Sequence, residues 1–262
     1  MPASLDPRHT RVKRAIALLL TFAAGLVDIT GYLALYNTFT AHMTGTTVHL
    51  GNSLVTAQWR QAIMAASVVS AFVLGSIVGR IIIEIGSRKH MRSVATITLA
   101  LEAILLLTLV FAGDHVISSH GNTGPASTTS LLLAMLAAAM GIQTATLTRV
   151  GPLTVHTTFV TGMLNKLAQL IAHSLYATWD ALTCHPDQRA QHHAERAQAS
   201  SQAVFLFGIW LLYLAGAAAG TVLYHRWGIR TLFIATVALI VAIAADLVQP
   251  LSIEEEQEQS ER

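Results

Sequence analysis

Charged residues are scarce in this chain. Only 11% of its 262 residues are Asp, Glu, Lys or Arg, whereas 53% are hydrophobic. Soluble domains carry roughly one quarter charged residues, so this composition excludes a soluble globular protein and predicts an integral membrane protein. The net charge is only +2, which points to no nucleic-acid partner.

Cysteine is also nearly absent, and so are enzyme motifs. The single Cys184 excludes an internal disulfide. There is no hydrolase elbow, metalloprotease helix, phosphate-binding loop or Rossmann fingerprint, so we expect neither enzyme activity nor a cofactor. Cys184 and His185 precede His192 and His193, but their spacing matches no recognised zinc pattern. We expect a solvated linker there; a metal site is the alternative.

Long apolar runs, by contrast, are abundant. A hydrocarbon core of about 30 Å requires about 20 apolar residues per helix. Six segments meet this requirement, namely 15–36, 62–83, 93–112, 130–150, 203–224 and 231–249. The first follows a basic stretch, as a signal peptide would, but it is too long for a signal core and lacks a small-x-small cleavage site. We therefore expect a retained first helix.

The chain repeats itself after about 117 residues. In the first copy, Gly25-Leu-Val-Asp28 leads into Phe39-Thr-Ala-His-Met-Thr-Gly45. In the second, Gly141-Ile-Gln-Thr144 leads into His156-Thr-Thr-Phe-Val-Thr-Gly162. An odd number of spans per copy inverts the second copy in the membrane. Inverted repeats are typical of secondary transporters, with the ligand site between the halves.

A pair of closely spaced glycines also occurs in each copy. Gly75 and Gly79 in the first copy correspond to Gly216 and Gly220 in the second. Glycines four residues apart let helices approach closely. Packing alone explains them; a sliding interface during transport is the alternative.

The basic residues indicate an orientation. If the chain has six spans and a cytoplasmic N-terminus, Arg60, Arg226 and Arg230 lie outside and the other 13 of the 16 Lys and Arg residues lie inside. The positive-inside rule favours this arrangement over one with eight spans, and it places both termini in the cytoplasm. The expected parts are a basic arm (1–14), a first three-helix repeat (15–112), an external linker (113–129), a second repeat (130–249) with a cytoplasmic insertion (178–201), and an acidic tail (250–262).

The Thr-Gly segments need not cross the membrane. Residues 37–45 span about 30 Å when extended, and residues 46–57 rise about 18 Å as a helix, so this segment could dip past the midplane and return. Its counterpart would be Thr161-Gly162 followed by a helix over 163–176. The two helix N-termini would then meet near the centre and favour an anionic group. A pair of interfacial helices is the alternative.

Two acids, Asp28 and Glu102, lie inside predicted spans. Each costs about 2.5–3.5 kcal/mol to place at the bilayer centre, so each needs a partner or a proton. We expect both to serve in proton coupling; a hydrogen bond or ion pair between helices is the alternative. Asp246, near a cytoplasmic end, is expected to snorkel. The predicted substrate-binding residues are Asp28, Thr44, Gly45, Thr46, Gln143, Thr144, Thr161, Gly162, Asn165 and Lys166.

These motifs resemble the YoaK family of bacterial integral membrane proteins (domain of unknown function 1275). The resemblance rests on Ala24–Asp28 with Phe39–Gly45, and on Met140–Ala145 with Thr157–Gly162, and it covers roughly residues 15–249. The family pattern usually has Asn where Thr46 and Thr144 stand here. The resemblance implies about six spans in a bacterial inner membrane, and it supplies no activity.

The sequence thus predicts an all-α membrane protein with six transmembrane helices, arranged as two inverted three-helix repeats. Each repeat contains a Thr-Gly segment that is re-entrant or a broken helix. The expected function is secondary transport of an unidentified small, polar, anionic metabolite, coupled to protons. A membrane scaffold or sensor that transports nothing is the alternative, and a channel is a third. The expected partner is the lipid bilayer, and a homo-oligomer is compatible with the sequence.

Overall fold

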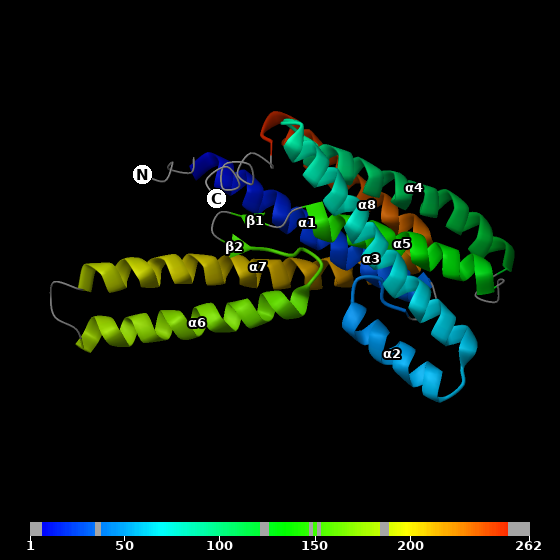
Figure 1. The fold of residues 1–262 in the computed structure, drawn as a ribbon, viewed down its shortest axis with the longest axis horizontal. Coiled ribbons are helices and arrows are strands. Elements are labelled where there is room, and N and C mark those ends of the chain that lie inside the picture. The colour runs from blue at the N-terminus through cyan, green and yellow to red at the C-terminus, as the bar shows by residue number, and fades with distance from the viewer. Residues whose placement is uncertain are drawn as a thin grey trace.

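The computed structural model describes residues 7–34, 38–120, 126–146, 149–150, 153–183 and 189–250. This part of the chain is almost entirely helical, as predicted (Figure 1). The first half holds α1 (Pro7–Ala34), α2 (Met43–Val55), α3 (Trp59–Arg88) and α4 (Val94–His120). The second holds α5 (Ala126–Thr146), α6 (Val160–Thr183), α7 (Arg189–Trp227), the 3-10 turn η3 (Gly228–Thr231) and α8 (Leu232–Val248). A short antiparallel hairpin, β1 (Arg149–Val150) and β2 (Leu153–Thr154), precedes α6.

Several helices extend beyond the predicted apolar segments. Helix α1 already begins at Pro7 and includes much of the expected basic arm, since proline is well tolerated at the first position of a helix. Helices α4 and α5 take up most of the expected linker at 113–129. The expected insertion at 178–201 is largely the end of α6 and the start of α7, because its Ala, Gln, Arg and Glu residues favour helix. Residues 184–188, which include Cys184 and His185, lie outside the described residues.

Four helical stretches of the described chain are long and apolar enough to cross a membrane: Thr10–Ala34, Trp59–Arg88, Val94–Gly113 and Ala194–Val248. The last of these runs through α7, η3 and α8, and the apolar part of α5, Ser130–Thr146, is shorter. Many large apolar side chains on α3, α4, α7 and α8 are exposed, as lipid-facing positions would be. The coarse prediction of a helical membrane protein is confirmed, whereas the count of six spans remains a prediction.

The long helices pack in pairs that join the two halves of the chain. Helix α1 packs along α7, α3 along α5, and α4 along α8. The helices α1, α3, α4, α5, α7 and α8 alternate in direction along the chain. Helices α1 and α5 therefore run oppositely, as do α3 and α7 (Figure 1). Each half therefore packs its first long helix against the second long helix of the other half.

Glycines make the α1/α7 contact close. A Cβ atom added to Gly216 would lie 2.1 Å from the backbone oxygen of Phe22, and one added to Gly25 would lie 2.2 Å from that of Tyr213. Gly220 lies against Leu26 and Ile29 in the same way. Only glycine allows the two backbones this separation.

The α3/α5 contact is made by the corresponding glycines. A Cβ atom added to Gly141 would lie 2.2 Å from the backbone oxygen of Phe72, and one added to Gly75 would lie 2.2 Å from that of Ala138. Gly79 lies against Ile142 and Ala145. Each of these contacts has its counterpart in the α1/α7 pair.

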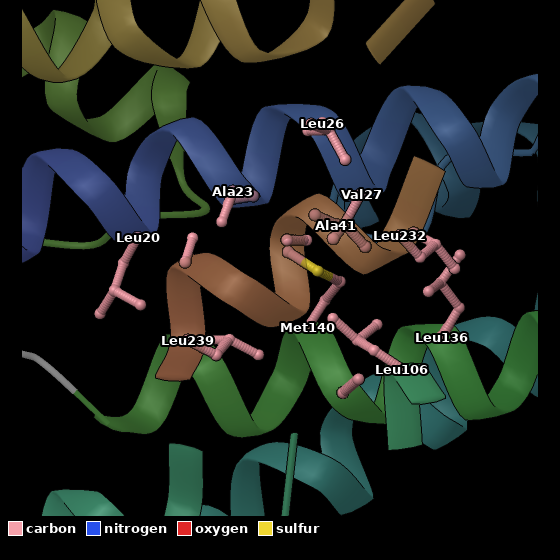
Figure 2. Close-up of a cluster of buried hydrophobic side chains, with 14 of the residues drawn as sticks. Leu20, Ala23, Leu26, Val27, Ala41, Leu106, Leu136, Met140, Leu232 and Leu239 are labelled. Carbon is pink, nitrogen blue, oxygen red and sulfur yellow. The ribbon is translucent and has the colours of Figure 1, made fainter. Parts of the chain in front are cut away.

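The middle of the bundle is apolar and packed. Figure 2 shows side chains of α1, including Leu20, Ala23 and Val27, close to Met140 of α5 and Leu239 of α8. All five are buried, at 2% exposure or less. Side chains fill this part of the region between the halves, and the ligand site there stays a prediction.

Helices α2 and α6 lie outside this bundle. Helix α2 packs against α3, and α6 packs against α7. Each helix begins beside the bundle and runs outward. Helix α2 runs toward the lower right of the view and α6 toward the left (Figure 1). The Thr-Gly segments therefore stand at the points where the chain leaves the bundle.

Candidate functional site

The carboxylate of Asp28 is the best-connected polar group among the described residues of the first half. It is buried on α1, with 2% exposure. Its Oδ1 accepts hydrogen bonds from the backbone N–H groups of Thr40 (2.8 Å) and Ala41 (2.9 Å), and from the hydroxyl of Thr40 (3.1 Å). Its Oδ2 lies 2.7 Å from Nδ1 of His42 and accepts a hydrogen bond from the Tyr213 hydroxyl over 2.9 Å. These five contacts use the whole acceptor capacity of an ionised carboxylate, which has about four lone-pair sites.

These contacts hold the Thr-Gly segment to α1. Hydrogen bonds to a charged group are worth about 1.5–3 kcal/mol each, and a buried carboxylate that lost them would be strongly unfavourable. Asp28 therefore determines where the segment leaves the bundle and where α2 begins. The structure shows the hydrogen-bonding role of Asp28, whereas its role in proton coupling stays a prediction. A proton arriving at Asp28 would weaken this set of contacts.

His42 links the segment to an aromatic group. Its ring centroid lies 5.1 Å from that of Phe39 and 5.9 Å from that of Tyr213, and Phe39 stacks on Tyr32 of α1 at 4.5 Å. The hydrogen bond to Asp28 raises the pKa of the His42 imidazole above its ordinary value of 6.5, while partial burial opposes this rise. His42 can therefore carry charge at a pH where a free histidine has lost it.

The sequence did not identify Thr40 or Tyr213 as site residues. Tyr213 belongs to α7, in the second half, and lies 185 residues from Asp28. A buried tyrosine hydroxyl usually has a hydrogen-bond partner, which was the available signal. Nothing in the sequence indicates which residue that partner is.

The second half has a neutral counterpart of this arrangement. Thr144 takes the place of Asp28, and its hydroxyl is hydrogen-bonded to that of Thr158, in the second Thr-Gly segment. The Thr144 hydroxyl also donates to the backbone oxygen of Met140 over 2.8 Å. Because each hydroxyl has a single proton, Thr158 is then the donor to Thr144. The first half uses a carboxylate where the second half uses only hydroxyl groups.

Gln143 connects the two halves near Thr144. Its Nε2 donates to the backbone oxygen of Leu20 in α1 over 2.8 Å. Its Oε1 is buried and, in the described chain, has no hydrogen-bond partner. A buried acceptor without a partner is costly, and such groups are few in native proteins.

The other predicted binding residues do not gather around Asp28. The Thr46 hydroxyl points back to the backbone oxygens of Phe39 and His42, at 3.1 and 3.2 Å. Lys166 donates to the backbone oxygen of Thr154 over 2.7 Å, which ties α6 to the hairpin. Five residues complete the set. Gly162 lies against the ring of Phe159, and the other four are exposed at the starts of α2 and α6, namely Thr44, Gly45, Thr161 and Asn165.

His156, in the second Thr-Gly segment, has no counterpart of the Asp28 contact. Its Nδ1 is buried without a hydrogen-bond partner in the part of the chain that the structure describes. Burial lowers the pKa of His156, and the positive charge of Lys166 lowers it further. The two segments therefore hold their histidines in opposite electrostatic settings.

The remaining acids have different surroundings. Glu102 is buried on α4 with 1% exposure, and its Oε2 has no hydrogen-bond partner among the described residues. Asp246 is fully buried on α8 and accepts hydrogen bonds from the backbone N–H (2.9 Å) and hydroxyl (2.7 Å) of Thr96. The expectation that Asp246 snorkels is wrong, because it caps the N-terminus of α4, where unpaired N–H groups favour a carboxylate.

Long apolar helices with lipid-type surfaces, close glycine packing and buried acids define a multi-pass integral membrane protein. The comparisons agree. The family model described as "Protein of unknown function (DUF1275)" matches residues 16–245, and the chain belongs to this family. It is 30% identical over 164 residues to the UPF0700 transmembrane protein YoaK of Bacillus subtilis (strain 168), covering 63% of this chain and 69% of that protein. No solved structure matches the chain.

Proposed function

We propose that the protein is a secondary transporter for a small, polar, anionic metabolite, coupled to protons. In this proposal it consists of two inverted repeats of three transmembrane helices in a bacterial inner membrane, with both termini in the cytoplasm. The observation that carries the proposal is the matched packing of the two halves, in which α1 meets α7 as α5 meets α3.

The glycine contacts support this relation residue by residue. Gly25 meets the backbone of Tyr213, and Gly141 at the corresponding position meets that of Phe72. Tyr213 and Phe72 each lie three residues before a matching glycine, Gly216 and Gly75. Two halves related in this way can exchange conformations, which gives the two states that alternating access requires.

The Thr-Gly segments are the parts best placed to move. Each stands between a bundle helix and a helix outside the bundle, and each is fastened by one polar contact set, at Asp28 or at Thr144. The Asp28 set also contacts α7 through Tyr213, so loosening it would affect both halves. Protonation of Asp28 is therefore our proposed coupling step, with Glu102 as a second proton carrier.

Flux in reconstituted vesicles tests the proposal. We expect uptake of at least one anionic metabolite from a panel, and faster uptake when a pH gradient is imposed. Asp28→Asn and Glu102→Gln should insert normally but lose the response to the gradient, since an amide cannot titrate. Asp246→Asn is the matched control, because that acid caps α4 and has no proposed part in coupling.

A scaffold or sensor that transports nothing is the second candidate. The apolar packing between the halves favours it, since a static bundle would have such a centre (Figure 2). Absence of flux across the whole panel, from protein that is folded and inserted, would support the scaffold. If Asp28→Asn and Glu102→Gln both still respond to a pH gradient with normal transport rates, neither acid is the proton carrier.

A further inference from the structure

A cavity of about 210 Å³ lies beside the first Thr-Gly segment. Three separate parts of the chain line it: Thr38 of the segment, His49 of α2, and Arg60, Gln61 and Met64 at the start of α3. We call it the Arg60 pocket. It shares no residue with the contacts around Asp28, although Thr38 is only two residues from Thr40.

The lining of the Arg60 pocket is cationic and rich in donors. Arg60 is positively charged at all relevant pH values and has five N–H donors in a planar fork that suits carboxylate and phosphate oxygens. The Gln61 amide, the Thr38 hydroxyl and the His49 ring can each donate a hydrogen bond. None of the lining residues is Asp or Glu, while Met64 is buried and supplies an apolar wall.

The position of Arg60 adds to this argument. It lies in the first turn of α3, where the N–H groups of the helix already carry partial positive charge. A bound anion in the neighbouring cavity would interact favourably with both the guanidinium and the helix.

The size of the cavity limits the ligand. Pockets for drug-sized ligands are about 300–1,000 Å³, so this pocket, at about 210 Å³, suits a smaller chemical group. We infer that the Arg60 pocket binds a single anionic group of the phosphate or carboxylate type.

The second half carries a cation at the matching place. His49 lies four residues after Gly45, and Lys166 lies four residues after Gly162. Both halves thus present a basic side chain on the helix that follows the Thr-Gly segment.

The inference rests on the proposed function only for the position of the pocket at one end of the transport path. Anion binding by the pocket does not require transport.

Inorganic phosphate is a suitable probe, with the full-length protein in detergent and calorimetric titration as the measurement. We expect wild-type protein to bind it. Arg60→Gln should weaken binding about tenfold or more, the equivalent of one charged hydrogen bond, and His49→Gln should weaken it severalfold. Arg226→Gln is the matched control, because it removes an exposed cation from the far end of α7 and should leave binding unchanged.

A phospholipid headgroup also carries a phosphate, so a second measurement is needed to distinguish a bound lipid from a free anion. Native mass spectrometry should count phospholipids that remain bound to wild-type protein and to Arg60→Gln. Phosphate binding that depends on Arg60 indicates a free solute anion. Loss of a bound phospholipid in Arg60→Gln, without phosphate binding, indicates a headgroup, and both results support an anion site.

If neither phosphate nor phospholipid binding differs between Arg60→Gln and Arg226→Gln, the inference is overturned. His49→Gln provides a second test should Arg60→Gln fail to fold. Arg60-dependent binding with no flux of any metabolite would remove the transporter proposal and leave this site standing. Flux without Arg60-dependent binding would remove the site alone.

Discussion

The Tyr213 hydroxyl donates a hydrogen bond to Oδ2 of Asp28 over 2.9 Å and so joins α7 to α1 across the two halves of the chain. The same carboxylate holds the Thr-Gly segment through Thr40, Ala41 and His42. One buried group thus connects the three parts of the protein that would have to move relative to one another during transport.

Replacing Tyr213 with Phe should lower the free energy of unfolding by about 1–2 kcal/mol, because a buried acceptor loses a donor while the ring is kept. Thermal unfolding in detergent measures this loss. Tyr224→Phe, at a half-buried site on the same helix, is the control and should have a smaller effect. Equal losses in the two variants would mean that the Asp28 contact contributes nothing specific.

Gly216→Ala should destabilise the protein by about 1–3 kcal/mol, since overpacking forces backbone shifts. Its Cβ would lie 2.1 Å from the Phe22 oxygen, so α1 and α7 must separate. The control is Gly51→Ala in α2, where nothing lies within 4 Å and alanine should be neutral or slightly stabilising. A stable, normally folded Gly216→Ala protein would contradict the close α1/α7 contact.

The stabilisation by His42 should depend on pH. Its pKa is higher in the folded protein than the ordinary 6.5, so its stabilising contribution is complete below that value and is lost as the pH rises through the raised pKa. Wild-type protein should therefore exceed His42→Gln in melting temperature at pH 5.5 by more than it does at pH 9. A difference that does not change with pH would show that the charged histidine is not what stabilises the segment.

Reporter fusions test the membrane orientation. Fusions after Arg92, between α6 and α7, and at the C-terminus should report the cytoplasm, and one after Thr123 should report the outside, as the distribution of Lys and Arg requires. An external result after Arg92 would rule out the inverted-repeat proposal, whatever the flux measurements give.

Cysteine labelling tests movement of the two Thr-Gly segments. Ala41 and Thr158 occupy corresponding positions and are both buried, at 8% and 3% exposure. In a Cys184→Ser background, Ala41→Cys should react with an impermeant reagent from outside and Thr158→Cys from inside. A bound substrate should change the two rates in opposite directions, because it favours one of two states. A scaffold predicts constant rates, and an open channel predicts that both sites react together.

Several features follow from the sequence because they depend on local properties. The apolar runs determine the membrane class and the approximate places of the long helices, since burying backbone in lipid requires helices of a minimum length. The helix bounds outside those runs do not follow from apolarity, because α1, α4, α6 and α7 continue into polar and Ala-rich residues of the predicted arm, linker and insertion. Apolarity measures burial in lipid and says little about where a helix ends in water.

The partners of the buried acids were decided by the tertiary structure alone. The sequence identifies Asp28 as an acid that needs partners, but His42 is brought to it by the chain leaving α1, and Tyr213 by the packing of α7. Asp246 likewise accepts a hydrogen bond from Thr96, 150 residues away in the first turn of α4. The local sequence pattern determines which face of a helix a residue occupies. The residue's partner depends on which helices pack together. In this protein, close glycine contacts between distant segments determine that packing.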